Sequence, residues 1–407
     1  FKAHSAFQHS NPDLPWGDFP EFKRKHQTWL EPYSLFMAIK DWQNGRPWWE
    51  WPESLRFFAR IDPSSLPQAT RDRADAYAFC QYVFFGQWQA IRNCANGRGI
   101  GIIGDAPIFV AADSADVWAN PRLFLLDGEL NPTVVAGVPP DYFSEDGQLW
   151  GNPLYNWPVH KADGYQWWKD RFAAVLNLVD KVRLDHFRGF AAAWNVPFGN
   201  PNARLGEWVK GPGIELIDEL KRAFPNLPII AEDLGVITPD VEEMRDRFEL
   251  PGMKILQFAF TGDPEDDFLP HHYPVNCFAY TGSHDNNTAR GWYDHATARE
   301  QDFCRRYLNV SGEDIAWSMI RACWQSVARY VVAPMQDLLS LGTEARMNLP
   351  GTQSGNWSWR MSKHALSDTL RDQIYRLNFL YSRLPDREKA ENTQRFLSET
   401  SDTVKPH

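Results

Sequence analysis

Three acidic residues are the first candidates for chemistry, because each stands just after a short run of strand-forming residues. They are Asp185, Glu232 and Asp285. Glycosidic bonds are commonly broken by two carboxyl groups, one that attacks the sugar or activates water and one that protonates the departing oxygen. These positions therefore predict glycosidic chemistry with Asp185, Glu232 and Asp285 as the catalytic carboxylates.

The surroundings of the first two carboxyl groups favour different charge states. Arg183 and Asp185 lie two residues apart and share one side of a strand, where a guanidinium stabilises the ionised carboxylate that a nucleophile needs. Glu232 leaves the apolar run Ile229-Ile230-Ala231, where partial burial would raise its pKa and keep it protonated, as a general acid requires. The alternative for Arg183 and Asp185 is a buried ion pair that only stabilises the fold.

Asp285 stands beside His284, which can donate hydrogen bonds to substrate hydroxyl groups. The two could instead be metal ligands, joined by His186 and by the histidine pair 271–272. The sequence has neither an HxH nor an HExxH spacing, which metal sites in barrels usually show. Because glycosidic chemistry needs no metal, we expect neither a metal nor a cofactor.

Composition narrows the class of partner. A formal net charge of -10 without clustered Lys and Arg argues against nucleic acid. The 19 Trp, 13 Tyr and 26 Phe residues indicate, with equal weight, a carbohydrate partner or a large aromatic core. No apolar run is long enough to span a bilayer, and the first residues lack the features of a signal peptide. We therefore expect no membrane partner, and a location in the bacterial cytoplasm or the plastid stroma.

Two further patterns concern packing. The five cysteines are odd in number and widely spaced, which predicts buried free thiols in a reducing compartment; they are Cys80, Cys94, Cys277, Cys304 and Cys323. Five residues recur at helical spacing within 70–93 and predict a face that packs against the core; they are Tyr77, Cys80, Phe84, Trp88 and Ile91.

The elements that must position the acidic residues alternate along the chain. The first ninety-odd residues predict helices, over 20–42 and 70–93, without a convincing strand. From Gly99 onward, six short strands alternate with helices, which implies a parallel sheet; their ranges are 101–103, 181–184, 227–231, 253–258, 277–281 and 330–333.

Polar residues at the strand ends, Asp105 among them, favour a closed barrel over a doubly wound sheet, because strand ends converge on the active-site face of a barrel. Six strands do not close an eight-stranded barrel. The predicted fold is an α/β TIM (β/α)8 barrel with inserted subdomains, lacking its first two barrel strands in this chain. We expect a mostly helical inserted subdomain over 1–96, barrel strands three to eight over 97–360 with an active-site loop insertion at about 111–160, and a C-terminal helical segment over 361–407.

The motifs together resemble a known family. Besides the three acidic segments, the stretches Gly104-Asp105-Ala106-Pro107-Ile108-Phe109-Val110, 135–144 with 150–153, and Glu344-Ala345-Arg346-Met347-Asn348 are similar to the amylomaltases, or 4-α-glucanotransferases, of glycoside hydrolase family 77. The likeness runs from about residue 20 almost to the end.

The resemblance implies roles for the matching residues. Asp185 would be the nucleophile, Glu232 the general acid and then base, and Asp285 the residue that grips sugar hydroxyls. The residues implied to bind the glucan are Arg183, His284, Asn348, Asp105, Asp141, Tyr142, Phe143, Trp150 and Phe258. The implied reaction moves α-1,4-glucan segments from maltooligosaccharides to the 4-hydroxyl of glucose or another glucan, through a covalent glucosyl-enzyme ester.

Two alternatives differ from this interpretation in class. An α-amylase-type hydrolase would use the same carboxylates with water as the acceptor. A non-catalytic glucan-binding protein would keep the fold without the reaction. The family begins with two barrel strands that have no counterpart here, so we expect a fragment, or a chain completed by a separate N-terminal segment.

Overall fold

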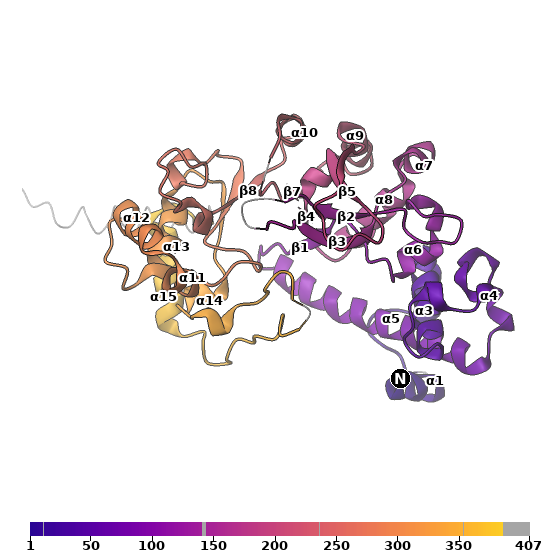
Figure 1. Ribbon diagram of the computed structural model, residues 1–407. Coiled ribbons are helices and arrows are strands. Elements are labelled where there is room, and N and C mark those ends of the chain that lie inside the picture. Colours follow the sequence, from indigo (N-terminus) through magenta and orange to yellow (C-terminus); the bar gives the residue numbers. More distant parts are fainter. Residues whose placement is uncertain (11, 141–143, 236, 353, 386–407) are drawn as a thin grey trace, which may run out of the picture. The chain divides into compact units, whose positions relative to one another are not determined.

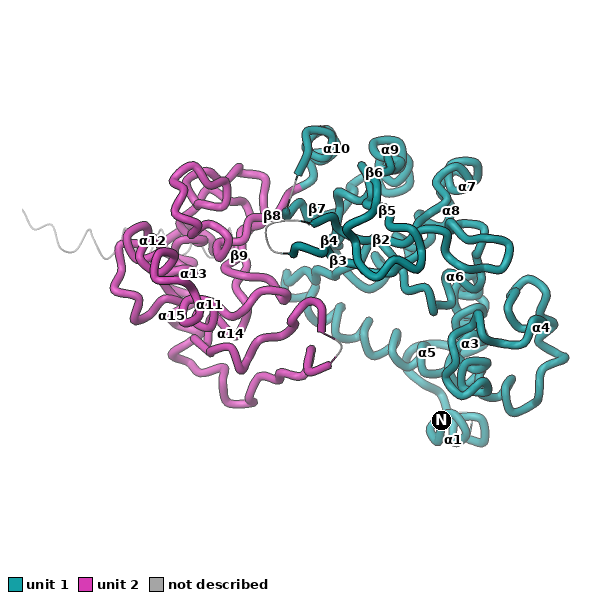
Figure 2. Tube along the Cα trace, in the orientation of Figure 1, with its two compact units in different colours: residues 1–250 teal, residues 251–407 magenta. Residues whose placement is uncertain are grey.

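The computed structural model describes residues 1–10, 12–140, 144–235, 237–352 and 354–385. The chain divides into two compact units, residues 1–250 and 251–407 (Figure 2). Each unit is described by itself below. The three regions predicted over 1–96, 97–360 and 361–407 stay a prediction.

The first hundred residues of unit 1 are helical, as predicted. The main helices are α1 (Lys2–Ser10), α2 (Phe19–Lys25), α3 (Gln27–Trp42), α4 (Glu53–Arg56) and α5 (Gln68–Asn96). The helix predicted over 20–42 is interrupted at His26, which ends α2 and precedes α3. The long α5 runs beside α3 (Figure 1) and buries Ala78, Phe79 and Tyr82.

A parallel three-stranded sheet forms the centre of unit 1. It contains β1 (Ile103–Pro107), β4 (Lys181–Asp185) and β7 (Ile229–Ala231), in the order β1-β4-β7. The connections run through helices, as parallel strands require. These include α6 (Ala115–Ala119), α7 (Trp157–Ala162), α8 (Gln166–Leu176) and α9 (Ile214–Ala223), and α10 (Pro239–Arg247) follows β7.

The first strand lies later than the predicted range 101–103. Gly99 has a positive φ of 74°, and the N–H of Ile102 donates to the Asp180 carboxylate at 2.7 Å. The chain therefore joins the ladder only at Ile103, opposite Lys181. As a result Asp105 lies inside β1 and not after it.

An antiparallel sheet in unit 1 has no counterpart in the sequence analysis. Its strands are β2 (Val134–Val138), β3 (Gln148–Pro153), β5 (Ala192–Pro197) and β6 (Glu207–Lys210), in the order β3-β2-β5-β6. Two of these strands come from the segment between β1 and β4, and two from the segment between β4 and β7. Both excursions leave the carboxyl ends of parallel strands, where the acidic residues stand.

Unit 2 contains a second parallel sheet, with β8 (Gly252–Ile255), β9 (Cys277–Tyr280) and β10 (Tyr330–Val332) in the order β10-β9-β8. Its helices are α11 (Ala289–His295), α12 (Ala298–Leu308), α13 (Ile315–Gln325), α14 (Met335–Leu338) and α15 (Asp368–Leu380). The apolar α13 is at the centre of the helical core and buries residues such as Met319, Ile320 and Cys323. The predicted mixed α/β class is confirmed.

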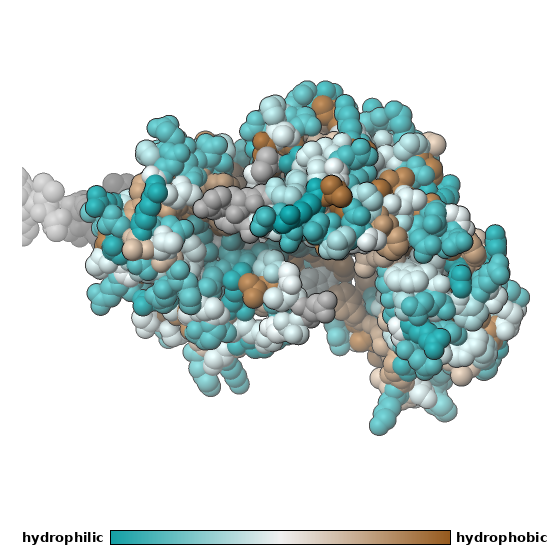
Figure 3. Space-filling view, in the orientation of Figure 1, coloured by the Kyte–Doolittle hydropathy of each residue, from teal (hydrophilic) through white to brown (hydrophobic). Residues whose placement is uncertain are grey.

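Two packing predictions were wrong in part. On α5, Phe84 and Ile91 are 45% and 57% exposed, because the helix turns a different face to α2 and α3. Cys277, Cys304 and Cys323 are buried free thiols, but Cys80 and Cys94 are exposed. Apolar residues on the visible face of unit 1 occur in small patches between hydrophilic ones (Figure 3). Within the described ranges, no helix is long and apolar enough to cross a bilayer.

The aromatic core of unit 1 provides a test of this packing. Trp118 is fully buried and its indole N–H donates to the carbonyl of Leu55 at 2.9 Å, whereas Trp42 is 45% exposed. We predict that Trp118→Ala lowers the free energy of unfolding by about 3–5 kcal/mol, because the cavity and the lost contacts add. The control Trp42→Ala should change it by about 0.5 kcal/mol or less. Chemical denaturation measures both, and equal effects would contradict the assigned core.

Candidate active site

An arginine joins two acidic side chains across the parallel sheet of unit 1. Arg183 lies on β4 with Asp105 opposite it on β1, and its guanidinium donates to the Asp105 carboxylate at 2.6 Å and to the Asp185 carboxylate at 2.7 Å. Arg183 is 8% exposed, while the side chains of Asp105 and Asp185 are 41% and 43% exposed. The structure therefore fixes Asp185 by a charged hydrogen bond and leaves much of it accessible.

Glu232 follows β7, the neighbour of β4. Its two carboxyl oxygens accept backbone N–H groups, from His186 at 2.7 Å and from Leu234 at 3.1 Å. Burial raises the pKa of Glu232 to about 7, and the negative charge of Asp185 adds to this, while Arg183 and the two N–H donors oppose it. The direction is the one expected from the apolar strand that precedes Glu232. Near neutral pH the carboxyl group holds a proton in a large fraction of molecules.

Of the loop residues predicted to contact the glucan, the structure describes Trp150. Trp150 lies on β3, is 38% exposed, and meets the ring of His186 edge to face, with the ring centroids 4.7 Å apart. Phe109 lies 6.3 Å from each of these rings, measured between centroids. Asp141, Tyr142 and Phe143 lie outside the described residues. Trp150 therefore lies against His186, the residue that follows Asp185.

In unit 2, a second group surrounds Asp285. The Asn348 side-chain amide donates to one carboxylate oxygen at 2.6 Å, and the His284 ring nitrogen Nε2 lies 3.1 Å from the other. The guanidinium of Arg346 donates to the Asp285 carbonyl at 2.7 Å, and the ring of Trp357 lies 5.2 Å from that of His284, between centroids. The structure brings His284, Asp285 and Asn348 together.

One predicted residue lies in a different element from the one expected, and three residues near the site have a contact that the sequence does not predict. Phe258 lies in the short helix Leu256–Ala259, is 42% exposed, and contacts Phe268. Arg346 lies within the motif 344–348 but had not been given a role, and Trp357 carried no signal in the sequence. The sequence suggests His186 only as a possible metal ligand. Its residue type does not reveal that its backbone N–H donates to Glu232.

The arrangement suits chemistry at a carbon that carries a leaving group. Arg183 donates to the Asp185 carboxylate, and burial raises the pKa of the neighbouring Glu232 to about 7. An anion and an acid side by side are what double displacement at a glycosidic carbon requires. Over the described part of the chain, no cluster of three or more His, Cys, Asp or Glu residues could hold a metal ion.

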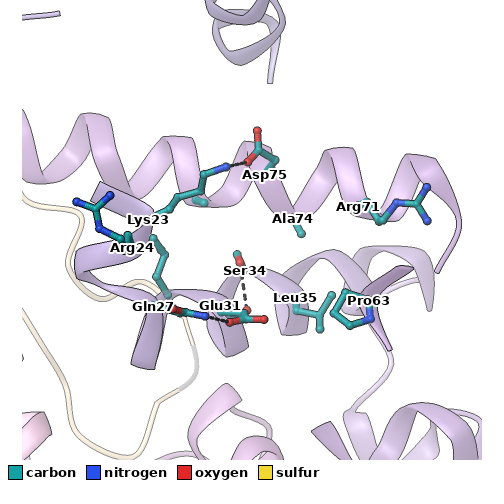
Figure 4. A pocket seen from close by; sticks show the side chains of 12 residues that line it. Lys23, Arg24, Gln27, Glu31, Ser34, Leu35, Pro63, Arg71, Ala74 and Asp75 are labelled. Carbon is teal, nitrogen blue, oxygen red and sulfur yellow. Dashed lines mark hydrogen bonds and ion pairs between the residues drawn. The ribbon is translucent and has the colours of Figure 1, made fainter. Parts of the chain in front are cut away.

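A hollow between α3 and α5 lies apart from these residues. Its volume is about 480 Å³, and Leu30, Leu35 and Ala78 line its apolar part. Its polar groups bond mostly to one another: Lys23 pairs with Asp75 at 2.6 Å, and Gln27 donates to Glu31 at 3.1 Å (Figure 4). None of the predicted site residues lines it.

Comparison with known families decides between the possible uses of these carboxylates. The model of one family, described as 4-alpha-glucanotransferase and numbered glycoside hydrolase family 77, matches residues 2–367. The chain belongs to this family. The function predicted from the sequence, 4-alpha-glucanotransferase, and the predicted class of enzyme are thereby confirmed, and hydrolysis is not favoured.

Relatives of the family agree with the match. A 4-alpha-glucanotransferase from Thermus thermophilus is 50% identical over 357 residues, which cover 86% of this chain and 71% of that protein. A chloroplastic/amyloplastic relative from Arabidopsis thaliana is 44% identical over 87% of this chain and 62% of that protein. An amylomaltase from Streptococcus agalactiae, solved in complex with acarbose, has a TM-score of 0.85 at 36% identity, covering 90% of this chain and 74% of that one.

The raised pKa of Glu232 has a consequence for stability. The folded protein holds the proton more tightly than the unfolded chain does, whose Glu has its ordinary pKa of 4.5. The stabilising contribution is therefore complete below about pH 4.5 and is lost as the pH rises through about 7. We predict that the free energy of unfolding of the wild type, minus that of Glu232→Gln, falls by up to about 3 kcal/mol from about pH 4 to about pH 8.

Glu219 provides the control, because Lys169 lowers its pKa. For Glu219→Gln the same difference should rise with pH, since the ionised form is the one that the fold stabilises. Denaturation series at several pH values measure both. A pH-independent difference for Glu232→Gln would show that its carboxyl group titrates normally.

Proposed function

We propose that the chain transfers segments of α-1,4-glucans and maltooligosaccharides to the 4-hydroxyl of an acceptor glucose or glucan by a retaining double displacement. Asp185 attacks the anomeric carbon while Glu232 protonates the departing oxygen, so that a glucosyl-enzyme ester forms and the shortened glucan leaves. Glu232, now ionised, then takes the proton of the incoming 4-hydroxyl, whose oxygen displaces Asp185.

One observation carries this assignment. Of two carboxyl groups on neighbouring strands, Asp185 is bound to the buried guanidinium of Arg183, and Glu232 has a pKa of about 7. The first is suited to attack, and the second is suited to give up and regain a proton within each cycle, because a general acid–base works best when its pKa lies near the working pH.

Asp285 is proposed to grip the sugar hydroxyl groups and so to stabilise the oxocarbenium-like transition state. Its carboxylate is oriented by the Asn348 amide and lies against His284, which supports a fixed binding geometry. We propose that Arg183, His284, Asn348 and Asp105 line the pocket of the sugar that is cleaved. Asp141, Tyr142, Phe143, Trp150 and Phe258 would contact the glucan on either side of the bond.

We also propose the finer fold. The six parallel strands β1, β4, β7, β8, β9 and β10 would be strands three to eight of one (β/α)8 barrel, with residues 1–96 as an inserted helical subdomain and 361–407 as a C-terminal helical segment. An N-terminal segment would supply the first two strands. Supporting this, β1 is an edge strand of the described parallel sheet, and its Ile103 is 45% exposed.

Extension of the chain tests the barrel. We predict that joining the part of the Thermus thermophilus relative that the match does not cover to the N-terminus of this chain raises glucan transfer and thermal stability, because it would cover the exposed edge of β1. Activity assays and thermal denaturation of the chain with and without this extension measure both. Equal values would contradict the proposed completion.

The acceptor distinguishes transfer from hydrolysis. Incubation with maltotriose should yield glucose together with a ladder of longer maltooligosaccharides, and glucose should serve as an acceptor. Reducing ends that increase without a ladder would indicate hydrolysis, and binding without turnover would indicate a glucan-binding protein. Since the relatives include bacterial proteins and a chloroplastic/amyloplastic one, we propose the cytoplasm or the plastid stroma as the location.

The two carboxylate roles can be separated with an activated donor. The fluoride ion of a glycosyl fluoride leaves without protonation, so Glu232→Ala should still form the ester on Asp185 but should release the sugar slowly. With ordinary glucans the same variant should lose about 10²–10⁴-fold in turnover. Intact mass and peptide mapping detect the trapped sugar on Asp185.

Asp180→Asn is the matched control. Asp180 also pairs with an arginine, Arg92 at 2.7 Å, but it precedes β4, at the opposite end of the strand from Asp185. Asp180→Asn should lower stability without lowering turnover, whereas Asp185→Asn should abolish turnover. An active Asp185→Asn variant would remove Asp185 from its proposed role.

A further inference from the structure

The backbone leaves the regular strand conformation immediately after Asp185. His186 has φ 55° and ψ 49°, in the left-handed region. Gly adopts this conformation freely, residues such as Asn and His do so at a modest cost, and β-branched residues do so at the largest cost. Histidine occupies the position, and the contacts described below hold it in this turn.

The hydrogen bonds between β4 and β7 show what the turn does. The Val182 N–H donates to the Pro228 carbonyl at 2.9 Å, and the Glu232 N–H donates to the Leu184 carbonyl at 3.1 Å. In a regular parallel ladder, alternate residues bond to the same neighbouring strand. The next hydrogen bond would therefore run from the His186 N–H to the Glu232 carbonyl. It accepts the N–H of Phe187 instead, at 3.2 Å. One extra residue is therefore inserted, as in a β-bulge, and the His186 N–H leaves the ladder.

The released N–H donates to the side chain of Glu232, at 2.7 Å from Oε2. Leu234 supplies the second donor, at 3.1 Å from Oε1. Each carboxyl oxygen has two acceptor directions, so one remains on each oxygen for the transferred proton and for substrate. The two backbone donors thus hold the carboxyl group in one orientation without consuming its capacity to react.

The ring of His186 holds the turn from the other side. It meets Trp150 edge to face, with centroids 4.7 Å apart, and a Cβ atom on residue 189 would lie 3.1 Å from its Cδ2, so Gly189 makes room for it. Burial and the nearby Arg188 lower the pKa of His186 to about 4, so the ring is neutral near pH 7. Replacing the ring therefore removes packing but no charge from the surroundings of Glu232.

We propose that His186 is a positioning residue, whose left-handed backbone aims its N–H at Glu232 and sets the direction of the acid–base carboxyl group. This inference rests on the proposed function, because it gives Glu232 the role of general acid and base. The charged groups that act on Glu232 from β4 are Arg183 and Asp185, and a substitution at residue 186 removes neither of them.

Two pairs of variants separate the backbone from the ring. His186→Asn and His186→Val both lose the ring, but only Asn tolerates the left-handed conformation. We expect His186→Val to have a kcat at least about tenfold below that of His186→Asn, with a similar KM. The N–H bond lowers the pKa of Glu232, so its loss should also move the alkaline limb of the pH–rate profile to higher pH in the Val variant. If the Val variant does not fold, His186→Gly against His186→Ala makes the same comparison, with Gly the more active.

A strained position elsewhere provides the control. Asn309 ends α12 with φ 55°, so Asn309→Val should lower the melting temperature and leave the pH–rate profile unchanged. Equal kcat values and equal pH profiles within the His186 pairs would overturn the positioning role, whereas a fully active Glu232→Gln variant would overturn the proposed function itself. Measurements use the 407-residue chain with maltotriose.

Discussion

A single buried guanidinium, that of Arg183, interacts with all three acidic residues of the site in unit 1. Asp105, Asp185 and Glu232 come from three adjacent strands, and Arg183 binds the first two directly. Arg183 also opposes the rise in the pKa of Glu232, but burial and the negative charge of Asp185 outweigh it, so that the pKa of this carboxyl group is about 7. The proposed division of labour between Asp185 and Glu232 follows from this difference in surroundings.

The backbone supplies what side-chain charge does not. The parallel pairing of β4 and β7 brings Asp185 and Glu232 to the same edge of the sheet, and the inserted residue at the end of β4 turns a ladder N–H toward a side chain. Both features depend on main-chain geometry and would survive many side-chain changes. In unit 2 side chains hold Asp285 instead, because the Arg346 guanidinium donates to its carbonyl and the Asn348 amide donates to its carboxylate.

Much of this could be predicted from residue types and order. The apolar run before Glu232 predicted its raised pKa, and the spacing of Arg183 and Asp185 predicted their ion pair. The start of β1 could not be predicted, because it depends on Asp180 capturing the N–H of Ile102. The face of α5 that carries Phe84 and Ile91 is exposed, contrary to the prediction, because periodicity identifies a face but not the neighbours that cover it. The donors to Glu232 depend on a left-handed histidine, which no sequence pattern marks.

The antiparallel sheet of unit 1 has a consequence for how such proteins can diverge. Its two inner strands, β2 and β5, come from different excursions of the chain and pair directly, with Val135 opposite Val196 and Gly137 opposite Trp194. A Cβ atom at residue 137 would lie 2.7 Å from the carbonyl of Gln148 and 3.2 Å from the side chain of Val196. A change of backbone position in one of these paired strands must therefore be matched by a change in the other.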